Sequence, residues 1–106
     1  MKKVYEKLVR DKIPEIINKG GNKCVIATLS DEEYCKKLEE KLFEEVNEFK
    51  SDKTVEELAD ILEVVYALAK NMGVSKTELE DLRLKKANSR GGFEEKILLK
   101  WVEGRE

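Results

Sequence analysis

The chain has 106 residues, enough for one small domain with a modest hydrophobic core. Charged residues make up 42% of the chain, but the net charge is only −2, so the composition favours neither nucleic acid nor an anionic membrane as a partner. Histidine is absent, which excludes imidazole as a base or ligand and leaves carboxylates, lysine, hydroxyls and a metal ion for any catalysis.

The two cysteines, Cys24 and Cys35, lack the spacing of a metal site and are expected to be reduced thiols. No apolar run approaches the roughly 20 residues that span a bilayer. No secretory signal is recognisable in the sequence. We therefore expect a cytoplasmic protein with a single domain over residues 1–106 and no association with a membrane.

The first third of the chain predicts only one short helix. The opening ten residues are basic and partly apolar. A helix is expected after the capping residue Asp11, with Pro14 in its first turn, where the missing N–H does no harm. The glycine pair 20–21 ends it. Residues 23–29 are rich in β-branched side chains and indicate a short strand or an ordered loop.

Three longer helices have clear start signals, because a Ser or Thr is followed three residues later by a Glu that can complete a capping box. The expected helices cover residues 31–50, 54–72 and 75–89, and the apolar stretch 93–102 predicts a final short helix that packs back on the others. The fold class is therefore all-α, a compact helical bundle. The capping pairs are Ser30 with Glu33, Thr54 with Glu57, and Ser75 with Glu78.

Two acidic pairs occupy unusual positions in the two central helices. Glu45 lies on the apolar stripe of the first central helix, and Glu48 follows one turn later. Glu57 lies on the stripe of the second, with Asp60 one turn further on. Because carboxylates are almost never buried without partners, this placement indicates a metal ion held between the two helices.

The alternative is a solvated acidic face that binds nothing. The spacing alone does not separate the two interpretations, because a chain with 23 acidic residues contains about as many such pairs as chance would yield. Only the position of the pairs on the apolar stripes favours the metal.

A cationic row follows on the third long helix, where Arg83, Lys86 and Arg90 fall on one face. The row could bind phosphate groups held against a metal at the acidic pairs, since Mg²⁺ prefers carboxylate oxygens and bridges to substrate phosphates. Alternatively, the cations favour the helix dipole and cover apolar surface.

The acidic segments EEVNEF and EELADILEVVYAL resemble the paired motifs EExxE and ExxD of the MazG-like nucleoside triphosphate pyrophosphohydrolases. The opening KLVRDKIPEII and the later KKANSRGGFEEKILL are similar to the subgroup related to phosphoribosyl-ATP pyrophosphohydrolase. The resemblance covers nearly the whole chain. It implies an all-α protein, a homodimer or higher homo-oligomer, that cleaves a nucleotide substrate between its α and β phosphates with Mg²⁺, or alternatively Mn²⁺.

The resemblance also implies roles for individual residues. Glu44 becomes the candidate catalytic base or a support for the ligands. The positions that match as metal ligands are Glu45, Glu48, Glu57 and Asp60, and Lys86 and Arg90 match as phosphate ligands. Arg10 and Lys12 match the leading motif and are candidate substrate ligands, and Arg83 is a further candidate from its place in the cationic row.

Two alternative functions stay open on the sequence alone. A phosphoribosyl-ATP pyrophosphohydrolase of histidine biosynthesis would use the same metal chemistry on another nucleotide. A helical interaction module without catalysis would explain the stripes and the charges, and would show no dependence on magnesium.

Overall fold

The computed structural model describes residues 1–104, which form four α-helices and no strand. The helices are α1 (Ile13–Lys19), α2 (Asp31–Asp52), α3 (Val55–Asn71) and α4 (Lys76–Arg90). The predicted all-α class is confirmed. Within this part of the chain, no helix combines the length and the apolar character needed to cross a membrane.

The three long helices begin where their capping residues predict. Ser30 and Ser75 each accept a hydrogen bond from the backbone N–H three residues on, and a Glu side chain returns to the cap, which completes both capping boxes. Thr54 caps α3 in the same way, by accepting from the N–H of Glu57. α2 continues two residues further than expected and ends at Asp52, and its C-cap Lys53 adopts the left-handed conformation with φ 53°.

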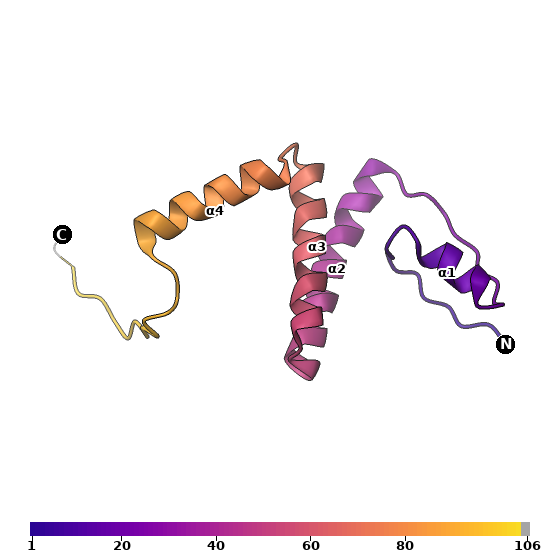
Figure 1. Ribbon diagram of the computed structural model, residues 1–106, viewed down its shortest axis with the longest axis horizontal. Coiled ribbons are helices and arrows are strands. Elements are labelled where there is room, and N and C mark those ends of the chain that lie inside the picture. Colours follow the sequence, from indigo (N-terminus) through magenta and orange to yellow (C-terminus); the bar gives the residue numbers. More distant parts are fainter. Residues whose placement is uncertain (105–106) are drawn as a thin grey trace.

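α2 and α3 form an antiparallel hairpin that contains the buried core. The two helices are joined by only two residues and contact each other extensively, as Figure 1 shows at the centre of the molecule. Leu38 of α2 is 2% exposed, and Val64 and Ala69 of α3 are each 8% exposed. Leu38 and Val64 lie on the predicted apolar stripes, so the amphipathic pattern positions the hairpin.

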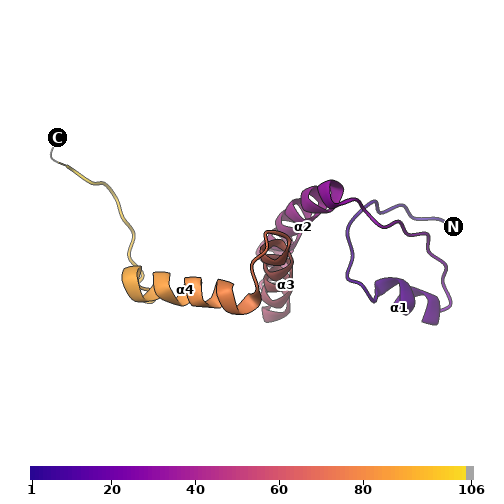
Figure 2. The same cartoon turned by 90° about the horizontal axis from the view of Figure 1, so that it is seen from above.

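The other helices extend from this hairpin in opposite directions. α4 contacts α3 only weakly and leads away from the hairpin in both views (Figure 1 and Figure 2). α1 and the N-terminal segment lie on the other side. The Cα trace therefore extends over 63 × 31 × 26 Å, and the compact helix contacts are those within the hairpin.

Two local predictions were wrong, and the structure decides between two alternatives for a third segment. α1 has Lys12, not Asp11, at its N-cap, and no side chain caps it. Residues 23–29 form a loop rather than a strand, because no second strand is available among residues 1–104 to pair with them. Residues 93–102 form no helix and are exposed, since the stretch has no capping residue and Lys96 turns at φ 59°.

Candidate metal centre

Glu45 is the central side chain of the site. It lies on α2 between Leu42 and Phe49 on the stripe that faces α3, and only 6% of the residue is exposed. One carboxylate oxygen, Oε1, is 3.2 Å from the Lys41 ammonium, one turn earlier on α2. The other oxygen, Oε2, is buried and has no hydrogen-bond partner. An unpartnered buried carboxylate oxygen is costly, so it is a candidate ligand for a cation.

α3 brings two further carboxylates to the same place. Single oxygens of Glu45, Glu57 and Asp60 all lie within 4.8 Å of one another, which is close enough for one ion to contact all three. The Oε2 atom of Glu57 is also buried without a partner. Each helix of the hairpin therefore contributes one carboxylate with an unpartnered buried oxygen to the same cluster.

A second group of three carboxylates overlaps the first at Glu45. Oxygens of Glu44, Glu45 and Glu48, all on α2, also lie within 4.8 Å of one another. The predicted ligand Glu48 is thus close to Glu45, while Glu57 and Asp60 approach Glu45 from α3. All the donors are hard carboxylate oxygens, the set that suits Mg²⁺, Ca²⁺ or Mn²⁺ rather than zinc or copper. The residues fit a divalent cation, and their assignment as its ligands stays a prediction.

The pKa values of the two neighbouring glutamates are shifted in opposite directions. Burial raises the pKa of Glu45, and repulsion from Glu48 adds to the rise, while Lys41 opposes it. Burial alone would also raise the pKa of Glu44, but hydrogen bonds and attraction from Lys7 and Lys41 outweigh it and hold that pKa below its ordinary value. Glu44 is therefore a carboxylate held in its ionised form.

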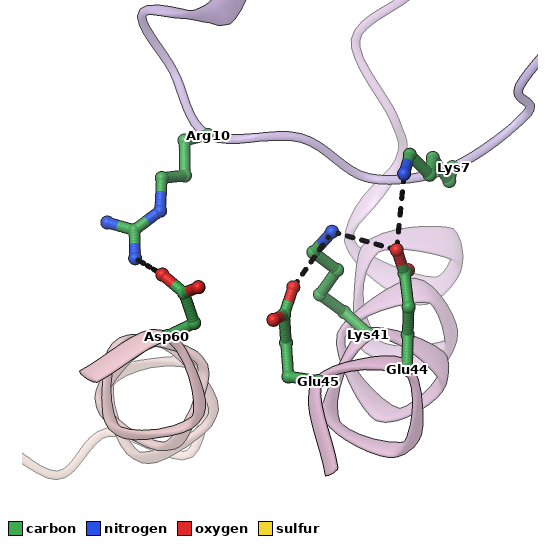
Figure 3. A network of polar contacts seen from close by, with 6 residues as sticks. All are labelled: Lys7, Arg10, Lys41, Glu44, Glu45 and Asp60. Atoms are coloured by element: carbon green, nitrogen blue, oxygen red, sulfur yellow. Dashed lines mark hydrogen bonds and ion pairs between the residues drawn. The ribbon is translucent and has the colours of Figure 1, made fainter. Parts of the chain in front are cut away.

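The N-terminal segment passes over the hairpin and covers the cluster with cations (Figure 3). Arg10 reaches α3 and places its guanidinium nitrogen 2.6 Å from an oxygen of Asp60. Lys7 places its ammonium 3.2 Å from an oxygen of Glu44 on α2. Arg10, predicted as a substrate ligand, thus lies at the acidic site. Lys12 is exposed at the start of α1.

The cations of α4 are not brought to this cluster within one chain. Arg83 is paired on its own helix with Glu80, at 2.9 Å through its Nε atom. Lys86 and Arg90 are exposed on the part of α4 that leads away from the hairpin. Their predicted contact with phosphates, if made at the acidic cluster, requires another chain or a movement of α4, and it stays a prediction.

Two lysines that were not among the predicted site residues lie at the site in the structure. Lys41 lies between Glu44 and Glu45, 3.4 and 3.2 Å from an oxygen of each, and its side chain is only 16% exposed. Lys7 is separated from Glu44 by 37 positions in the chain. The spacing from Lys41 to Glu45 signals a pair within one helix, whereas no local pattern predicts the Lys7 contact.

Comparison with known proteins agrees with this architecture. The chain belongs to the MazG-like family, whose sequence model matches residues 32–103. It is similar to a protein of Mycolicibacterium smegmatis described as uncharacterized, with 53% identity over 47 residues. That match covers 44% of this chain and 48% of the relative, so the chain spans about half the length of the curated protein it matches. No solved structure shows a significant match.

Proposed function

We propose that this protein hydrolyses a nucleoside triphosphate, or a related nucleotide, between its α and β phosphates and releases a nucleoside monophosphate and pyrophosphate. Mg²⁺ is the proposed cofactor, and Mn²⁺ is the alternative, because both accept carboxylate oxygens. The observation that supports this most strongly is Glu45, a buried carboxylate with an orphaned oxygen, beside Glu57 and Asp60 in a chain of the MazG-like family.

The positions of the carboxylates and of Arg10 support the following proposed roles. Glu45, Glu48, Glu57 and Asp60 would hold the cation, which would act as a Lewis acid on the phosphate oxygens. Arg10, now paired with Asp60, is the cation of the N-terminal segment nearest to these ligands and would turn to a phosphate once a metal neutralises Asp60.

Glu44 is the proposed general base. It is adjacent to Glu45 in the chain, and its ionised form is favoured by Lys7 and Lys41. An ionised carboxylate within reach of a water molecule can accept its proton as the water attacks phosphorus. A low pKa limits the strength of this base, so its main contribution is to orient the water and to receive the proton at a fixed position.

The test is a screen of the common nucleoside triphosphates for pyrophosphate release, with Mg²⁺, with Mn²⁺ and with a chelator. We expect release from at least one nucleotide that depends on the metal and is lost in Asp60→Asn. Phosphoribosyl-ATP is assayed in parallel, and its selective hydrolysis would redirect the substrate assignment without changing the reaction class. Absence of metal-dependent release from every nucleotide would contradict the proposal.

A further inference from the structure

A pocket beside the carboxylate cluster is lined by three lysines. It has a volume of about 210 Å³ and lies between the N-terminal segment and α2. Lys7 comes from the N-terminal segment, and Lys37 and Lys41 come from successive turns of α2. Glu6, Leu8, Glu40 and Glu44 complete the lining, and the pocket borders the cluster through the proposed base Glu44.

The lysines also hold the walls of this pocket together. Lys37 donates a hydrogen bond of 3.2 Å from its ammonium group to the backbone oxygen of Glu6. Lys7 spans from the N-terminal segment to Glu44 on α2, as Figure 3 shows. Two contacts in opposite directions therefore fix the segment against α2, and they place all three ammonium groups along one short length of the hairpin.

Each lysine is neutralised by a carboxylate that has a second possible partner or faces solvent. Lys37 is 3.6 Å from Glu40, whose side chain is 66% exposed. Lys41 shares Glu44 with Lys7 and also contacts Glu45, a proposed metal ligand. A cation bound by Glu45 would compete with Lys41 for that carboxylate. Lysine is a point charge on a flexible stem and can change partners without rearranging the backbone.

We propose that this three-lysine pocket, formed by Lys7, Lys37 and Lys41, binds the pyrophosphate end of the nucleotide and retains pyrophosphate after cleavage. The inference rests on the proposed function, because it places the leaving group beside the proposed metal and base. In this inference the phosphates bind to lysines of the same chain that holds the carboxylates. The cations of α4 are not used, because α4 leads away from the hairpin.

The test uses Lys37, which contacts neither the proposed base nor a proposed metal ligand. Inorganic pyrophosphate is titrated calorimetrically, at a fixed Mg²⁺ concentration, into wild type and Lys37→Ala. We expect Lys37→Ala to weaken pyrophosphate binding about tenfold, as for loss of one hydrogen bond to a charged group, with little change in Mg²⁺ affinity. Lys37→Arg, which keeps the charge and the donor, should restore most of the affinity.

Two control variants separate this pocket from other cations. Lys36→Ala removes the adjacent, exposed lysine of α2 and should leave pyrophosphate affinity unchanged. Arg90→Ala removes a cation of α4. Wild-type affinity in Lys37→Ala, or a loss in Arg90→Ala without one in Lys37→Ala, would overturn the inference while leaving the proposed reaction intact. Failure of wild type to hydrolyse any nucleotide with metal would instead defeat the proposed function, and the inference with it.

Discussion

Glu45 is ionisable and buried, yet only one of its two carboxylate oxygens is paired, with Lys41. Leaving a buried charged group incompletely satisfied costs several kcal/mol in order-of-magnitude terms. The raised pKa of Glu45 has the same cause, since burial disfavours its ionised form. At the residue scale, a cation bound at Glu45 would therefore lower the free-energy cost of this incompletely paired buried carboxylate. A cation bound to a solvated carboxylate would have no such cost to offset.

Arg10 is the residue that a metal must displace from Asp60. Arg10→Gln should raise the affinity for Mg²⁺ by about two- to fivefold, because the ion pair is half exposed and such pairs are worth roughly 0.2–1 kcal/mol. Calorimetric titration measures the change. Lys3→Gln removes a charge from the same segment, where Lys3 lies over the Tyr5 ring, and controls for net charge. Equal affinities in Arg10→Gln and in wild type would show that Arg10 does not compete with the metal.

Glu44→Gln tests the proposed base. We expect kcat to fall about a hundredfold, within the range for general-base assistance, while Mg²⁺ affinity changes little. Single-turnover rates and metal titration on the same variant give both quantities. A parallel loss of metal affinity would make Glu44 a ligand, which its closeness to Glu45 and Glu48 also permits. Full turnover would remove it from the mechanism.

The sequence predicted the burial of Glu45 because the residue interrupts an apolar stripe, and helical periodicity is a local property. It did not predict that Lys7 and Arg10 lie over the cluster. These contacts join residues 37 and 50 positions apart, in a segment without regular structure, so no local pattern encodes them. The pairing of Arg10 with Asp60 therefore emerged only from the structure.

At the scale of elements, capping determines where the three long helices begin. Ser75→Ala should accelerate hydrogen exchange of α4 amides about fivefold, because loss of an N-cap costs about 1 kcal/mol. α2 and α3 should keep their protection, since α4 contacts α3 only weakly. Exchange measured by mass spectrometry resolves the helices. A loss of protection that spread into α2 would show that α4 is part of one cooperative unit.

The same cap gives α4 a dependence on pH. Hydrogen bonds from the Ser75 backbone and side chain lower the pKa of Glu78 in the folded state. A depressed pKa stabilises the fold above the ordinary pKa of glutamate, and this contribution is lost as the pH falls through the depressed value. α4 protection should therefore fall in the acidic range below that ordinary pKa. Glu78→Gln should reduce this pH dependence, and an unchanged profile would contradict the assignment.

The starts of the three long helices were predicted correctly because a capping box consists of only four consecutive residues. The expected helix over residues 93–102 was wrong because it rested on apolar content alone. Phe93 is 99% exposed and Trp101 is 75% exposed, so no neighbouring surface among residues 1–104 supports a helix there. Short helices are marginal without such packing.

Many large apolar side chains of the described residues are exposed. On the hairpin, Phe43 is 70% exposed, and Leu58 and Leu62 are each close to half exposed. Exposed apolar patches of this kind mark interaction sites, and small cores are often completed by oligomerisation. We predict a homodimer or a higher homo-oligomer with α3 near its interface.

Light scattering coupled to size-exclusion chromatography measures the molecular mass of the assembly. Wild type at micromolar concentration should have at least twice the monomer mass, and Leu58→Lys together with Leu62→Lys should lower it. Glu63→Gln, a substitution at an exposed residue of α3, is the control for a surface change on the same helix. A monomeric wild type would exclude this assembly and leave the exposed apolar residues without a partner copy.

The central claim is that the carboxylates of α2 and α3 bind a divalent cation, and a magnesium titration tests it most directly. Wild type should bind Mg²⁺ saturably, and its Tm should rise with concentration, since a ligand that binds only the folded state stabilises it. Glu57→Gln should weaken binding at least about tenfold, as expected when one charged ligand is lost, while Glu63→Gln on the same helix should bind as wild type does. No heat of binding and no shift in Tm at millimolar Mg²⁺ would contradict the claim.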